Sequence, residues 1–247
     1  MNTIQTKSFN LAVYSKGNES AEKLALVLPG RLDTKDYVHM KSLVDFLAGL
    51  GYFALSFDPP GSWESNGDIN QYTMSNYLKA INELIEHYGN KPTVLVGHSR
   101  GGSMAMLAGI TNPYVTHFIT VFSRPGPSSM GLEEARTKGV QVDYRDLPPG
   151  NVRTTEQKKF ELPYSYFEDA AQYDMRDGLR ECIKPKLFFV GLHDVDVKPG
   201  YVREAYEIAA EPKQLYELDS DHDYRLHPAI IEEVNRVIGS FLSKYSS

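Results

Sequence analysis

Apolar residues recur along the chain in two alternating arrangements, short unbroken runs and longer stretches at three- and four-residue spacing. The unbroken runs are typical of strands that are buried on both faces of a parallel sheet. The spaced stretches are typical of helices that bury one face. From the unbroken runs we expect strands at 24–28, 52–57, 93–96, 118–122, 186–190 and 214–218, and a short alternating run predicts a further strand at 9–14. We expect helices at 36–50, 73–88, from 100 onward, 201–210 and 228–242.

This alternation of strand and helix predicts an α/β fold with a doubly wound, mostly parallel sheet. The segment 124–180 interrupts the alternation and is rich in Pro, Gly and Tyr. It contains two alternating stretches, 140–144 and 157–162, that predict a hairpin, followed by a helix near 167–173. An insertion of this length in a regular sheet indicates a lid over the carboxyl ends of the strands. We therefore predict one domain, 1–247, with a lid insertion at 124–180.

Composition narrows the class of protein. With 41% hydrophobic residues and a net charge of −6, the chain resembles an ordinary globular protein, and it lacks the blocks of Lys and Arg that nucleic acids or anionic membranes attract. A single cysteine, Cys182, excludes an internal disulfide. The chain shows neither a signal-peptide pattern nor an apolar run long enough to span a bilayer, so we expect a cytoplasmic protein. No pattern in it predicts an oligomeric state.

The strongest candidate for chemistry lies where the strand at 93–96 runs into a helix. Gly97, Ser99 and Gly101 form a G-x-S-x-G motif across this junction. A sharp strand-to-helix turn exposes the serine hydroxyl, and a Cβ at either glycine would collide with neighbouring backbone. The same turn directs the backbone N–H of Arg100 toward the position of an oxyanion. Ser99 is therefore predicted to be a nucleophile.

A serine hydroxyl needs a base and a carboxylate that orients the base. Active sites in open α/β sheets gather beyond the carboxyl ends of the strands, which directs attention to the loops after the strands at 186–190 and 214–218. The second loop contains His222, which we assign as the base. The other histidines lie in helices, at the start of a strand, beside the nucleophile, next to the acid candidates or at the cap of the last helix. The first loop contains two acid candidates, Asp194 and Asp196, and spacing alone does not choose between them.

The order Ser99, Asp194, His222 resembles that of the α/β-hydrolase family, and the resemblance covers nearly the whole chain. The sequence around Gly191, Asp194, Val197 and Pro199 is similar to the family's acid loop, which favours Asp194 over Asp196. A serine at the turn excludes the family's dehalogenase and epoxide hydrolase branches, which use an aspartate.

The resemblance also implies a second oxyanion donor, the backbone N–H of Arg31, although Pro29 stands where the family has a histidine before Gly30. The predicted lid hairpin is similar to that of small feruloyl and cinnamoyl esterases. Aromatic residues of the lid could line an acyl pocket or form the lid's own core; they include Tyr144, Tyr164, Tyr166 and Phe167.

Together these patterns predict a cofactor-independent serine hydrolase, most simply a carboxylesterase acting on a small-molecule ester. The histidines show no helical i, i+4 pairing, so we expect no metal site. A serine peptidase or an acyltransferase would use the same residues. From a different class, a binding protein that has lost catalysis would retain the fold.

Overall fold

The computed structural model describes residues 2–245. The strands are β1 (Asn2–Gln5), β2 (Asn10–Lys16), β3 (Leu24–Leu28), β4 (Phe53–Phe57), β5 (Thr93–His98), β6 (Val115–Val121), β7 (Val140–Asp146), β8 (Gln157–Pro163), β9 (Lys186–Gly191) and β10 (Lys213–Leu218). The helices are α1 (Val38–Gly49), α2 (Met74–His87), α3 (Arg100–Thr111), α4 (Leu132–Lys138), α5 (Tyr164–Ala170), α6 (Arg176–Glu181), α7 (Pro199–Ile208) and α8 (Pro228–Tyr245), with short 3-10 helices η1 (Ile69–Gln71) and η2 (Tyr224–Leu226).

Within the described residues, eight strands form one sheet in the order β1-β2-β4-β3-β5-β6-β9-β10. β2 pairs antiparallel with both β1 and β4, and the other neighbours in the sheet are parallel. The central strands β3, β4, β5 and β9 are buried along their whole length, which is why they appear in the sequence as unbroken apolar runs. The predicted fold class, a mostly parallel α/β sheet, is confirmed.

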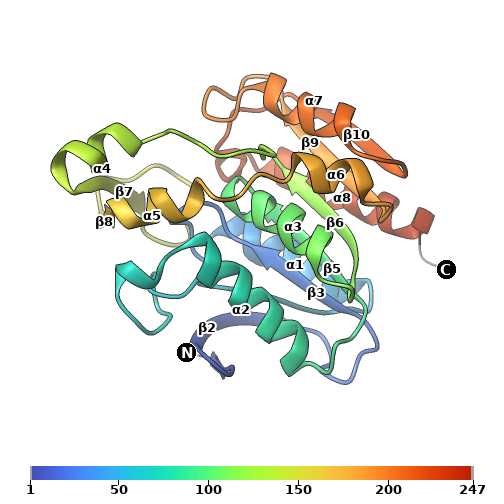
Figure 1. Ribbon diagram of the computed structural model, residues 1–247. Helices are drawn as coiled ribbons and strands as arrows, with labels where there is room; N and C mark the ends of the chain where they lie inside the picture. Colours follow the sequence, from blue (N-terminus) through green and yellow to red (C-terminus); the bar gives the residue numbers. More distant parts are fainter. Residues whose placement is uncertain (1, 246–247) are drawn as a thin grey trace.

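Helices cover both faces of this sheet (Figure 1). Buried side chains of α2, α3, α6 and α7 form one hydrophobic core with one face of the strands. Those of α1 and α8 form a second core with the opposite face. The sheet is thus the middle layer of three, which leaves its edges and strand ends as the places where a substrate can approach it.

The segment between β6 and β9 contains α4, the antiparallel pair β7 and β8, α5 and α6. Figure 1 shows α4, β7, β8 and α5 together at one end of the molecule, away from the C-terminus. They enclose a small core of their own, to which Tyr166 and Phe167 belong together with Tyr72 of the main body. By contrast, Leu179 of α6 packs in the core of the main domain. The predicted hairpin is confirmed by the antiparallel pairing of β7 and β8, and the last helix of the insertion, α6, packs against the main core.

The carboxyl ends of the parallel strands carry the loops that matter for function. β5 leads into Ser99, β9 leads into Asp194, and β10 leads into His222. Because parallel strands end at the same edge of the sheet, these three loops converge although the residues are widely separated in sequence.

Candidate active site

Ser99 occupies the junction between β5 and α3, with φ 52° and ψ −118°. A positive φ is uncommon for a residue with a side chain and costs of order 1–3 kcal/mol. A Cβ on Gly97 would come closer than 3.0 Å to the carbonyl oxygen of Gly101, and a Cβ on Gly101 would come as close to that of Leu28. Close approach of neighbouring backbone therefore requires both glycines, as the sequence predicted.

His222 bridges the nucleophile candidate and a buried carboxylate. Its Nε2 lies 2.9 Å from Ser99 Oγ, and its Nδ1 lies 2.7 Å from Asp194 Oδ2. Burial alone would lower the pKa of His222, but its hydrogen bond to Asp194 and the charge of that carboxylate outweigh burial, so the pKa is raised above its ordinary value. The structure thus brings Ser99, His222 and Asp194 into one chain of hydrogen bonds.

The structure of the loop after β9 shows which of Asp194 and Asp196 contacts His222, a choice that spacing alone left open. Asp194 is 2% exposed, and its Oδ1 accepts the backbone N–H groups of Asp196 and Val197 at 2.9 and 2.8 Å. Asp196 is exposed, and it is Asp194 that contacts the imidazole. Since the two backbone bonds fix one oxygen of Asp194, its other oxygen is held in place for His222.

The two predicted oxyanion donors, Arg31 and Arg100, both line the cavity in which Ser99 lies. Arg100 is the first residue of α3, where an N–H has no partner within the helix, and Arg31 lies in the turn that follows β3. In the described part of the chain, the backbone N–H of neither residue has a hydrogen-bond partner. The turn at Arg31 is fixed on both sides, because Arg145 donates to the carbonyl of Arg31 at 2.5 Å and Tyr72 accepts the N–H of Leu32 at 2.8 Å.

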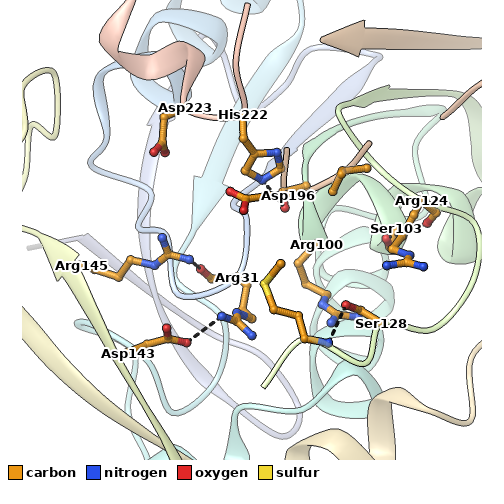
Figure 2. Close-up of a pocket in the computed structure, with 13 residues that line it drawn as sticks. Arg31, Arg100, Ser103, Arg124, Ser128, Asp143, Arg145, Asp196, His222 and Asp223 are labelled. Carbon is orange, nitrogen blue, oxygen red and sulfur yellow. Dashed lines mark hydrogen bonds and ion pairs between the residues drawn. The ribbon is translucent and has the colours of Figure 1, made fainter. Parts of the chain in front are cut away.

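This cavity has a volume of about 250 Å³, and Ser99 belongs to its lining. His222 lies at its edge (Figure 2). Its lining is mainly polar and includes four arginines, Arg31, Arg100, Arg124 and Arg145. The lid aromatics named above do not belong to its lining. Two of them, Tyr166 and Phe167, are instead buried in the core of the insertion. The structure therefore favours the core role for Tyr166 and Phe167.

A second cluster of titratable side chains, which no sequence motif marks, lies beside His222. His98 Nε2 contacts the carbonyl oxygen of His222 at 3.0 Å, and His98 Nδ1 lies 3.4 Å from Asp33 Oδ2. Burial alone would raise the pKa of Asp33, but the His98 hydrogen bond and the charge of Arg145 hold it well below its ordinary value. The ionised Asp33 therefore orients His98, which in turn holds the backbone of His222.

His39 completes this cluster and is buried with neither ring nitrogen hydrogen-bonded within the described residues. Burial and the nearby His98 lower the pKa of His39 to about 3, so it is neutral at physiological pH. The ligand atoms of Asp33, His39 and His98 all lie within 4.8 Å of one another, and a cation could be held there. No sequence pattern indicates this group, because its members come from a loop, a helix and a strand.

Comparison with known proteins agrees with the architecture. Residues 25–145 match the sequence model of the α/β hydrolase fold family. Mouse mitochondrial palmitoyl-protein thioesterase ABHD10 is 22% identical over 161 residues, which cover 60% of this chain and 50% of that protein. The chain thus spans about half the length of this curated relative.

Solved structures cover nearly the whole chain. The structure of mouse α/β hydrolase domain-containing protein 10 is similar with a TM-score of 0.76 and 20% identity, and covers 99% of each chain. Est1E from Butyrivibrio proteoclasticus, solved with ferulic acid bound, is similar with a TM-score of 0.74 and 20% identity, and covers 98% of this chain and 100% of the other. At these identities, the structural likeness establishes the fold.

Proposed function

The chain belongs to the α/β-hydrolase family, and on this basis we propose that it is a serine hydrolase that cleaves carboxylic esters through an acyl-enzyme on Ser99. The observation that supports this most strongly is the position of His222, with one ring nitrogen 2.9 Å from Ser99 Oγ and the other 2.7 Å from Asp194 Oδ2. This arrangement of nucleophile, base and orienting acid is the one that acyl transfer requires.

In the proposed reaction, Ser99 Oγ attacks the ester carbonyl carbon while His222 Nε2 takes the hydroxyl proton. The carbonyl oxygen becomes an oxyanion, which accepts hydrogen bonds from the backbone N–H groups of Arg31 and Arg100. Collapse of this intermediate breaks the bond to the alcohol oxygen, which leaves with the proton from His222. Water then attacks the acyl-enzyme with the same base, and the acid product and free Ser99 are released.

Asp194 has two roles in this scheme. Its Oδ2 fixes the tautomer of neutral His222 with the proton on Nδ1, so that Nε2 is free to accept the proton of Ser99. Its charge also stabilises the imidazolium that forms when that proton arrives. Because Asp194 is 2% exposed, water screens this interaction poorly.

The size of the cavity favours a compact substrate. At about 250 Å³ it is below the roughly 300 Å³ at which pockets for drug-sized ligands begin, and its walls are largely polar. The mouse relative is named a palmitoyl-protein thioesterase, and a thioester would form the same acyl-enzyme. A thioester with a short acyl chain is therefore the second candidate substrate, because the small volume of the cavity favours a short acyl group.

A panel of substrates tests the proposal. We expect turnover of 4-nitrophenyl butyrate and of a butyryl thioester, with much lower turnover of 4-nitrophenyl palmitate and of a butyryl anilide. Ser99→Ala should remove nearly all turnover, leaving a residual rate from oxyanion stabilisation and binding. Ser240→Ala, at an exposed serine of α8, is the matched control and should retain full activity.

Two results would contradict the proposal. Turnover in Ser99→Ala equal to that of the wild type would exclude Ser99 as the nucleophile. A wild-type protein that binds the esters without cleaving them would instead indicate a binding protein with the hydrolase fold.

A further inference from the structure

The four arginines of the cavity differ in whether a carboxylate neutralises them. Arg31 Nη2 forms an ion pair with Asp143 at 2.8 Å. Arg145 Nε lies 4.0 Å from Asp33 Oδ1. The charges of these two arginines are therefore balanced by fixed acids of the protein. The remaining two, Arg100 and Arg124, have no carboxylate partner among the residues that the structure describes.

The contacts that Arg100 and Arg124 do make orient their guanidinium groups without neutralising them. Arg100 Nη1 donates to the thioether sulfur of Met74 at 2.8 Å, and a thioether is a weak acceptor with no charge. The guanidinium carbon of Arg124 lies 4.0 Å from the centre of the Tyr201 ring, which is a stacking distance. Both cations thus stay available to a ligand in the cavity.

Arg124 also carries an unsatisfied donor. Its Nε is buried and has no hydrogen-bond partner within residues 2–245. Leaving a buried donor unpaired is destabilising, and more so when the group is charged. The side chain of Ser128 also lines this region, and its oxygen accepts the N–H of Met130 at 3.3 Å, so its hydroxyl hydrogen remains able to donate.

The acidic residues of the cavity lie away from these two arginines. Figure 2 shows Asp196 and Asp223 on the side of His222, and Arg100, Ser128 and Arg124 on another side. Asp223 is itself paired with Arg153 at 2.6 Å, whereas Asp196 is exposed. A negatively charged group would therefore be repelled from the His222 side and attracted toward Arg100 and Arg124.

We propose that the cavity selects esters that carry an oxyanion group, a carboxylate or a phosphate, which binds between Arg100 and Arg124 while Ser99 attacks the ester carbonyl. This inference rests on the proposed hydrolase function and specifies its substrate class. Planar guanidinium groups bind carboxylates and phosphates with paired hydrogen bonds, which supplies acceptors for donors that the protein leaves unpaired. The small volume of the cavity limits such substrates to short esters.

Matched pairs of esters test the proposal. The acyl-side pair is 4-nitrophenyl hydrogen glutarate and its neutral methyl ester; the alcohol-side pair is 3-(butyryloxy)propanoate and its methyl ester. A third anionic ester, 2-(butyryloxy)ethyl phosphate, distinguishes phosphate from carboxylate. We expect kcat/KM of the wild type to be at least tenfold higher for one of the anionic esters than for its neutral counterpart, and the favoured pair identifies where the anion lies.

Variants of the two arginines locate the effect. Arg124→Gln and Arg100→Gln should each lower the ratio of kcat/KM for the anionic ester to that for the neutral ester by about tenfold to a hundredfold, because each removes a charge-assisted contact. Arg236→Gln removes one positive charge from an exposed position on α8 and should leave the ratio unchanged. Equal ratios in all four proteins would overturn the proposal.

Binding to Ser99→Ala separates this proposal from the proposed reaction. By calorimetry, this variant should bind the favoured anionic ester at least tenfold more tightly than the neutral one, and the preference should disappear when Arg124→Gln is added. If Ser99→Ala binds the anionic ester more tightly but neither the wild type nor any variant hydrolyses an ester, the anion-binding site is supported and the hydrolase function is refuted. If esters are hydrolysed without any anionic preference, the hydrolase stands and the anion site fails.

Discussion

Substitution of Asp194 by Asn isolates the role of the buried carboxylate, because it removes the charge and keeps the shape. Asp194 Oδ1 accepts two backbone N–H groups, from Asp196 and Val197. In the Asp194→Asn variant, the amide oxygen must remain at these two donors, so the NH₂ group faces His222 Nδ1. His222 would then carry its proton on Nε2, and it could not accept the proton of Ser99.

The free-energy cost of reversing the amide in the Asp194→Asn variant can be worked out from the two backbone hydrogen bonds that it would lose. Turning the amide round would leave two backbone N–H groups unsatisfied at roughly 1–3 kcal/mol each, or about 2–6 kcal/mol in total. Loss of the carboxylate also removes stabilisation of the imidazolium. We therefore expect Asp194→Asn to lower kcat by about 10⁴-fold, the loss typical of a wrong histidine tautomer in a catalytic triad.

The assay is the rate of 4-nitrophenyl butyrate hydrolysis, measured with Asp196→Asn as the matched control. Asp196 is exposed and influences His222 through its charge alone, so this control should lose less than about fivefold. The reasoning would be refuted if Asp194→Asn retained more than a tenth of wild-type kcat, or if Asp196→Asn were the more damaging change.

Three further outcomes follow from the structure. Because the pKa of His222 is raised and its neutral form is the base, kcat/KM should rise with pH through a pKa above 6.5, and a rate–pH profile with a limb at or below 6.5 would contradict this. A Cβ at Gly101 would enter backbone, so Gly101→Ala should lower the free energy of unfolding by about 3 kcal/mol or more in urea titration, whereas a loss below about 0.5 kcal/mol would disagree. Arg225 forms an ion pair with buried Asp146 at 2.6 Å, which joins the segment after His222 to the insertion. Arg225→Met should therefore lower the free energy of unfolding by about 3–5 kcal/mol. A double-mutant cycle with Asp146→Asn that shows no coupling would exclude this ion pair as the cause.

The fold could be predicted because most of its strands and helices leave a recognisable pattern of apolar residues within their own segment of the sequence. Strands such as β3 and β9 are buried on both faces, and burial requires the unbroken apolar runs by which they are recognised. The elements that were missed are short or exposed: β1, α4 and α6. β1 is mostly exposed and pairs at the edge of the sheet, so its sequence carries little apolar signal.

In the candidate site, too, some residues could be predicted from local sequence and others could not. Ser99 and His222 could be named because a glycine-bounded turn and the ends of strands restrict where such residues can lie. Asp194 could not be separated from Asp196 by spacing, because the distinction depends on which carboxylate the loop buries. The stacking of Arg124 on Tyr201 could not be predicted from the sequence either, because the two residues are far apart in the chain.

The group of Asp33, His39 and His98 also could not be predicted from the sequence. His98 stands next to the nucleophile in sequence, and its contacts with Asp33 and the carbonyl of His222 arise only from the packing of distant segments. No periodicity or spacing records such contacts, because each involves residues from different elements.

The most direct test of the account is labelling with a fluorophosphonate, followed by intact mass and peptide mapping, on the wild type and on His222→Ala. The account predicts one adduct per chain, located on Ser99, and a labelling rate that collapses in the variant because Ser99 has lost its base. A wild type that stays unlabelled, or an adduct on another residue, would contradict the central claim that Ser99, His222 and Asp194 form a working catalytic triad.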